Sequence, residues 1–150
     1  MKTKTIRLIP TFLMLMFFTV AAQAQLTAKK QVYQPSQLMS PADLLKSYKS
    51  AKASQPIVYN IGFVGNIQGA KKIGAASKEE GLKQLMEEVR TLPKTTSIVV
   101  YCGCCPFEHC PNVRPAYTAL QKLGFSKTKI LDLPTSIKAD WIDKGYPMEK

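Results

Sequence analysis

The sequence predicts an α/β domain whose central, mostly parallel sheet is flanked by helices. Two apolar runs, Pro56 to Ile61 and Ser97 to Tyr101, have the length and composition of strands buried in a parallel sheet. Segments with apolar residues at helical spacing alternate with them. The chain has 150 residues, 45% hydrophobic and 21% charged, which suits one globular domain. This composition excludes a disordered tail, a collagen-like fibre and a multi-span membrane protein.

Residues 1–24 carry the pattern of a secretory signal peptide. Three basic residues precede an apolar stretch from Phe12 to Val20, and Ala22-Gln23-Ala24 supplies a small-x-small cleavage pattern. The apolar run is shorter than the roughly 20 residues that a membrane span needs. We therefore expect cleavage after Ala24, no stable membrane anchor and a periplasmic or secreted protein, in a compartment where thiols meet oxidants.

The remaining chain divides into a loose N-terminal arm (25–34) and one folded domain (35–150), with an edge strand expected within 25–37. Ser40-Pro41-Ala42-Asp43 predicts a helix start, because Ser40 can cap and proline suits the first turn. Ser77-Lys78-Glu79-Glu80 predicts a second capped helix, which Pro93 ends. A third helix is expected to end at Gly124. A strand over Lys129 to Leu133 and a short helix over Ile137 to Lys144, stopped by Gly145, complete the prediction.

The net charge of +11 falls to +8 without residues 1–24, which hold three bases and no acid. The lysines are scattered, and only Arg90 and Arg114 remain as arginines in the rest of the chain. A nucleic-acid partner would call for a stripe of arginines interleaved with aromatic residues, so we expect none. The charge fits either a solvated surface or a mild positive field that draws a small anionic substrate toward a site.

All four cysteines lie within nine residues, from Cys102 to Cys110, in a loop that joins a predicted strand to a predicted helix. We call residues 102–110 the cysteine loop. Sites in open α/β sheets form at the carboxyl ends of strands, and a helix N-terminus lowers the pKa of a nearby thiol. A cysteine in this place is suited to act as a thiolate nucleophile. Two structural disulfides are the alternative, although a disulfide stabilises most when it closes a long loop.

With its surroundings, this loop resembles the rhodanese-like family of single-domain sulfurtransferases. The resemblance rests on four segments in the family's order: Gly65 to Ala70, Ile98 to Cys102, Leu120 to Phe125, and Trp141 with Gly145 to Pro147. It spans about residues 35–150 and implies a rhodanese-like fold. It also implies transfer of sulfane sulfur through a cysteine persulfide, without a cofactor.

The resemblance places the catalytic cysteine at Cys102. Cys110 is the rival nucleophile, because it lies nearest Asn112, the expected N-cap of the next helix, and it is otherwise the resolving partner. Arg114 is the expected cation that holds an anionic sulfur donor. The chain departs from the family at Asn60-Ile61-Gly62, where members usually carry Asp-x-Arg, at Asn66 and Gln68 in the following turn, and in its longer, cysteine-rich loop.

Two alternatives use the same cysteine loop. The first is thiol–disulfide exchange with a thiol redox partner, because Cys102 to Cys105 has the C-x-x-C spacing. A thioredoxin fold does not fit, because too few residues follow Thr135 for its last hairpin and helix. The second is binding of a soft metal, Cu or Zn. Its ligands would come from Cys102, Cys104, Cys105, His109 and Cys110.

Overall fold

Five parallel strands form the centre of the structure, a computed structural model that describes residues 32–150. The hydrogen-bonded order is β1-β5-β4-β2-β3. The strands are β1 (Leu38–Met39), β2 (Ile57–Asn60), β3 (Lys71–Lys72), β4 (Ile98–Tyr101) and β5 (Thr128–Leu131). The predicted α/β class with a parallel sheet is confirmed. The predicted signal peptide (1–24) and residues 25–31 of the predicted arm lie outside the described residues.

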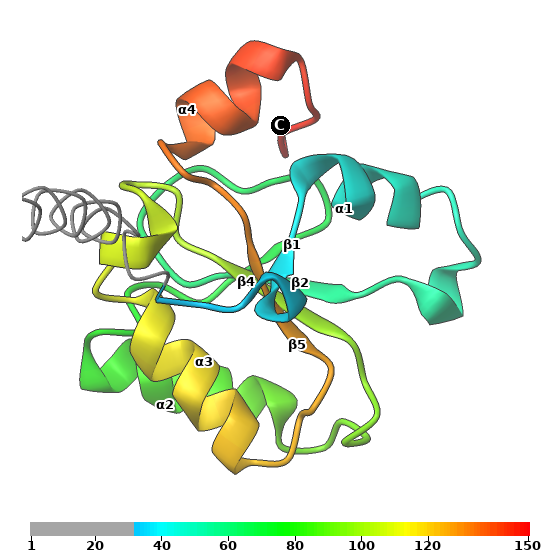
Figure 1. Cartoon of the computed structure of the whole chain (residues 1–150). Coiled ribbons are helices and arrows are strands. Elements are labelled where there is room, and N and C mark those ends of the chain that lie inside the picture. Colours follow the sequence, from blue (N-terminus) through cyan, green and yellow to red (C-terminus); the bar gives the residue numbers. More distant parts are fainter. Residues whose placement is uncertain (1–31) are drawn as a thin grey trace, which may run out of the picture. The chain divides into compact units, whose positions relative to one another are not determined.

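Helices cover both faces of this sheet (Figure 1). The helices are α1 (Pro41–Ser47), α2 (Glu79–Val89), α3 (Val113–Lys122) and α4 (Ile137–Asp140). α2 and α3 pack against one face, and α1 and α4 against the other. No helix within residues 32–150 is long and apolar enough to cross a membrane.

Successive side chains of β4 explain why its sequence is apolar without interruption. Ile98 and Val100 belong to the core cluster under α2 and α3, whereas Val99 and Tyr101 belong to the cluster under α1 and α4. All four are at most 1% exposed. Because side chains alternate between the faces of a strand and both faces are covered here, each position must be apolar or internally hydrogen-bonded.

The helix ends agree with the sequence at some positions and differ at others. The Ser40 hydroxyl caps α1 by accepting from the Asp43 N–H at 3.1 Å, as predicted. The predicted cap at Ser77 is wrong: α2 begins at Glu79, and no side chain caps it. The Ser77 N–H donates instead to the side-chain oxygen of Asn112, at 2.9 Å.

Several element boundaries also differ from the prediction. Within the described part of 25–37, Pro35–Gln37 forms a 3-10 turn, and the edge strand follows it as β1. The last strand ends at Leu131 instead of Leu133, before the chain turns toward α4. The last helix divides at Trp141, whose backbone leaves the helical region, into α4 and a 3-10 turn over Ile142–Lys144. The exposed strand β3 has no apolar pattern that could have predicted it.

A buried tyrosine joins the end of β4 to the turn after β2. The Tyr101 hydroxyl accepts from the Ile67 N–H at 2.9 Å and lies 3.3 Å from the Gly65 carbonyl oxygen, to which it donates. Tyr101 and Ile67 are each at most 1% exposed, so water cannot replace this hydroxyl. The contact holds two of the segments that carry the family resemblance in one arrangement.

Tyr101→Phe should lower the free energy of unfolding by about 1–3 kcal/mol, because the Ile67 N–H loses its partner in a buried place. Tyr59→Phe is the matched control on the neighbouring strand. The Tyr59 hydroxyl is buried without a hydrogen-bond partner among the described residues, so its removal should leave the protein at least as stable. Urea denaturation of both variants measures the difference. Equal losses in the two variants would contradict the assignment.

Candidate active site in the cysteine loop

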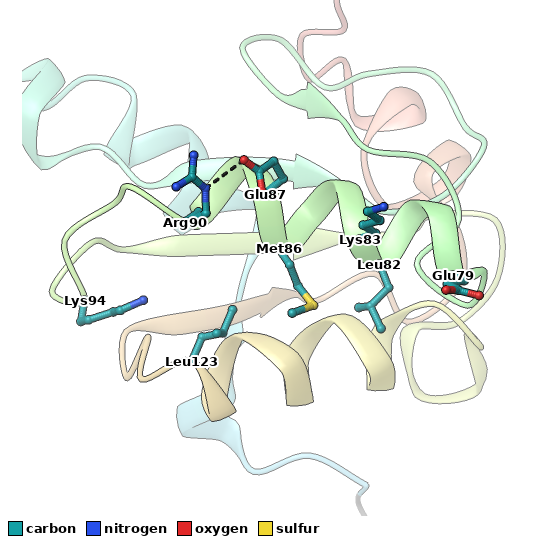
Figure 2. A pocket seen from close by; sticks show the side chains of 8 residues that line it. All are labelled: Glu79, Leu82, Lys83, Met86, Glu87, Arg90, Lys94 and Leu123. Carbon is teal, nitrogen blue, oxygen red and sulfur yellow. Dashed lines mark hydrogen bonds and ion pairs between the residues drawn. The ribbon is translucent and has the colours of Figure 1, made fainter.

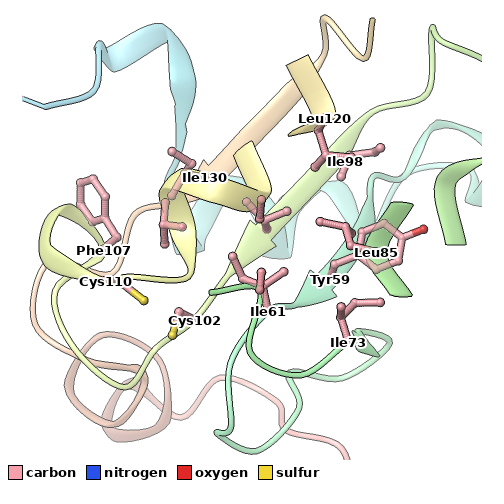
Figure 3. Close-up of a cluster of buried hydrophobic side chains, with 14 of the residues drawn as sticks. Tyr59, Ile61, Ile73, Leu85, Ile98, Cys102, Phe107, Cys110, Leu120 and Ile130 are labelled. Carbon is pink, nitrogen blue, oxygen red and sulfur yellow. The ribbon is translucent and has the colours of Figure 1, made fainter. Parts of the chain in front are cut away.

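Cys102 is the first residue after β4, and its side chain closes one end of the core under α2 and α3 (Figure 3). It is 2% exposed. Gly103 follows in the left-handed backbone region, with φ of 74°. The carbonyl of Gly103 accepts from the Ile137 N–H at 2.9 Å, which ties the start of the loop to α4. The predicted position of a cysteine at the carboxyl end of a central strand is therefore confirmed.

Three of the four thiols meet at this point. The Sγ atoms of Cys102, Cys104 and Cys110 all lie within 4.8 Å of one another. Cys104 Sγ is 3.2 Å from Cys102 Sγ, and Cys105 Sγ is 3.5 Å from Cys104 Sγ. Cys110 is buried and Cys104 is exposed, so the group extends from the core to the surface. None of the four cysteines forms a disulfide in the structure, in contrast to the alternative of two structural disulfides.

Asn112 donates a hydrogen bond to the buried sulfur. Its side-chain Nδ2 lies 3.2 Å from Cys102 Sγ, and its Oδ1 accepts from the Ser77 N–H. The second bond determines the orientation of the amide, because only its nitrogen can then face the sulfur. Asn112 is 4% exposed and holds the position just before α3, where the sequence predicted a helix cap. Its side chain makes no capping hydrogen bond.

The three thiols differ in acidity because of these contacts. Hydrogen bonds from Cys110, then from Asn112 and Cys104, outweigh burial and lower the pKa of Cys102 from its usual 9.0 to about 5. The same bond raises the pKa of Cys110, which has to keep its proton to donate. Partial burial and the neighbouring sulfurs raise the pKa of Cys104 to about 12. These directions favour a thiolate on Cys102 at neutral pH, beside protonated Cys104 and Cys110.

The departures from the family pattern near β2 have a structural reason. A Cβ atom at Gly62 would lie 2.7 Å from Cys102 Sγ and 3.0 Å from its carbonyl oxygen, so no larger residue fits there. Asn60 stands at the position where the family usually carries aspartate. Its buried amide donates to the Val64 carbonyl and to Asn66 Oδ1 and accepts from the Gly62 N–H. This neutral network holds the turn without an ion pair.

The other predicted site residues lie at the edge of this group. Arg114 is exposed in the first turn of α3. Burial raises the pKa of the Tyr33 hydroxyl, and the nearby Arg114 guanidinium partly offsets that effect. Among residues 32–150, no hydrogen bond joins Arg114 to a cysteine. His109 is exposed, and neither it nor Cys105 belongs to the cluster of three sulfurs that could hold a metal. The structure thus brings together three of the five predicted metal ligands.

Neither a protein-family model nor a curated protein sequence matches the chain. Solved structures do. The anaerobic ergothioneine biosynthesis enzyme from Chlorobium limicola, in complex with its natural substrate trimethyl histidine, matches with a TM-score of 0.56 and 18% identity over 76% of this chain. A cysteine-to-serine variant of EanB with hercynine matches over 81%, with a TM-score of 0.55 and 19% identity.

A third match is an EanB variant with a cysteine persulfide, in a tetrahedral intermediate state with ergothioneine. Its TM-score is 0.54, with 18% identity over 75% of this chain. The chain shares its fold with part of these enzymes. It spans less than a third of the length of these enzymes, since 28%, 29% and 27% of their chains are covered. At this identity the likeness extends to the fold alone.

A cavity between α2 and the end of α3 contains none of the thiols. It has a volume of about 510 Å³ and runs along α2 toward the end of α3 (Figure 2). Apolar side chains of Leu82, Met86 and Leu123 form its floor, and no cysteine lines it. The candidate site is therefore separate from this cavity and is defined by its sulfur chemistry.

Asn112→Ala should raise the pKa of the Cys102 thiol by about one pH unit, because one hydrogen bond to the thiolate is lost. Ultraviolet absorbance of the thiolate, followed as the pH rises from acid to neutral, measures this pKa. Asn66→Ala is the matched control, since that asparagine contacts Asn60 and Glu149 instead of a cysteine. An unchanged midpoint in Asn112→Ala, or an equal change in both variants, would contradict the role of Asn112.

Proposed function

We propose that the chain is a sulfurtransferase that accepts sulfane sulfur on Cys102 as a persulfide and passes it to a thiol. The supporting observation is the single thiolate at the end of β4, held by hydrogen-bond donors next to two protonated cysteines. The fold that the chain shares with enzymes of sulfur chemistry agrees with this proposal.

In the proposed reaction, the Cys102 thiolate attacks the outer sulfur of a small anionic donor such as thiosulfate. The bond between the two donor sulfurs breaks, and its electron pair leaves with sulfite. The product is a persulfide anion on Cys102, so the total charge is conserved. The Asn112 amide and the Cys110 thiol that stabilise the thiolate are close enough to stabilise the inner part of this anion as well.

Two further proposals concern the surroundings of the reaction. Arg114 is proposed to attract the anionic donor toward the loop, in the manner of an exposed cation at the edge of a site. The protein is proposed to act after export to a periplasm or outside the cell, where a thiol redox partner keeps the cysteines reduced. That proposal rests on the pattern of residues 1–24.

Binding of a soft metal is a second candidate function. The Sγ atoms of Cys102, Cys104 and Cys110 are close enough to share one ion. Three sulfurs without a fourth protein ligand suit Cu(I) better than tetrahedral Zn²⁺. The native mass of the protein distinguishes the two functions, because a metal and a single added sulfur differ in mass.

Cys102→Ser should lower the rate of sulfur transfer from thiosulfate to a thiol acceptor by at least about a thousandfold, because the attacking thiolate is removed. Steady-state kinetics of sulfite release measure this rate. Cys105→Ser is the matched control and should retain most of the activity, since Cys105 lies outside the cluster of three sulfurs. Full activity in Cys102→Ser together with loss of activity in Cys110→Ser would show that Cys110 is the nucleophile.

Arg114→Ala should raise the KM for thiosulfate by about three- to tenfold and leave kcat nearly unchanged, because it weakens attraction of the anion and not the chemical step. Added salt should reduce the difference from the wild type. Arg90→Ala is the control, since it changes the net charge equally at an arginine that is paired with Glu87 on α2. An equal change of KM in both variants would show that only the net charge of the protein matters, and not the position of Arg114.

A further inference from the structure

Cys102 and Cys104 face each other across one glycine. The left-handed backbone of Gly103 brings the flanking sulfurs to 3.2 Å. A Cβ atom at Gly103 would lie 2.7 Å from the Cβ of Ile137, so this turn is packed against α4 as well as hydrogen-bonded to it. The short distance between the two sulfurs is therefore a property of the packed loop and not of a free surface side chain.

Cys104 and Cys110, the two thiols next to Cys102, differ in their exposure to solvent. Cys110 is 5% exposed and keeps its proton beside the Cys102 sulfur, so it acts from within the core. Cys104 is exposed and protonated beside that thiolate. A disulfide that includes Cys104 would be open to an external thiol, whereas one between Cys102 and Cys110 would be closed to it. The sequence predicted Cys110 as the resolving partner, and the geometry favours Cys104.

We infer that Cys104 is the resolving thiol of the site and gives the protein a second activity, the release of sulfide. The inference rests on the proposed persulfide on Cys102. The Cys104 sulfur attacks Cys102 Sγ, the inner sulfur of the persulfide. The bond between Cys102 Sγ and the outer sulfur breaks, and the outer sulfur leaves as hydrosulfide with the electron pair and the proton of Cys104.

The electron balance of this step identifies the class of partner that the protein needs. The outer sulfur gains two electrons, and the two cysteines lose two electrons as they form a Cys102–Cys104 disulfide. Two molecules of a low-molecular-weight thiol, or one dithiol protein, then supply two electrons and become a disulfide. This restores the Cys102 thiolate and the Cys104 thiol, which keeps one of the two protons released. Such a disulfide includes the exposed Cys104, which leaves it open to reduction by an external thiol.

A single-turnover experiment with thiosulfate tests the inference on the full chain. The protein is reduced, freed of reductant and mixed with thiosulfate, and both the intact mass and the released sulfide are followed. Thiosulfate yields sulfite on loading, so any sulfide reports the resolving step. The wild type should release one sulfide per chain and become about 2 Da lighter than the reduced protein.

Cys104→Ser should load sulfur, stay about 32 Da heavier and release sulfide at least about tenfold more slowly than the wild type. Cys105→Ser is the matched control and should behave as the wild type. Cys110→Ser should load more slowly, but once loaded it should still release sulfide and form the disulfide. Release of sulfide from Cys104→Ser at the wild-type rate, or its loss in Cys110→Ser alone, would overturn the inference.

The same experiment separates this inference from the proposed function. If wild type and Cys104→Ser both load sulfur and both keep it, Cys104 is not the resolving thiol and the sulfurtransferase proposal stands. If neither the wild type nor Cys104→Ser takes up sulfur or releases sulfite, the proposed function is wrong, and the inference is overturned with it.

Discussion

The hydrogen bonds to one buried sulfur atom are the interaction on which the rest of this site depends. A thiolate that is 2% exposed has lost most of its contact with water, and burial alone would keep it protonated. Asn112 and Cys110 replace that solvation with donors that the fold holds in place. Without these donors, burial would keep the Cys102 thiol protonated, and it would be an unreactive core cysteine at the same strand end.

The neighbouring segments leave space for the Cys102 sulfur and orient the side chain that donates a hydrogen bond to it. The Cys102 sulfur occupies the space that a side chain at position 62 would need. At position 103, where the chain turns, a side chain would clash with Ile137 of α4. The Ser77 N–H orients the Asn112 amide from a loop that precedes α2. Residues from three separate parts of the sequence thus act on one atom, which is why the site forms only in the folded protein.

The sequence predicted the strand that positions the site better than the side-chain contacts within the site. The apolar run before Cys102 sufficed to place that cysteine at the end of a central strand, because buried strands have a strong local pattern. The role of Asn112 could not be seen, because asparagine before a helix ordinarily predicts a cap and its contact with Cys102 depends on packing. The prediction of a cap at Ser77 was wrong for a related reason. The capping pattern is local, whereas the Ser77 N–H donates to Asn112, which is distant in the sequence.

The measurement that tests this account most directly is the pH dependence of sulfite release from thiosulfate in a single turnover of the wild-type chain. We expect one sulfite per chain, with a rate constant that rises through a midpoint near pH 5 and stays level at neutral pH, because the fraction of Cys102 thiolate controls the attack. A rate that rises only near the ordinary thiol value of 9.0, or no release of sulfite at any pH, would contradict it.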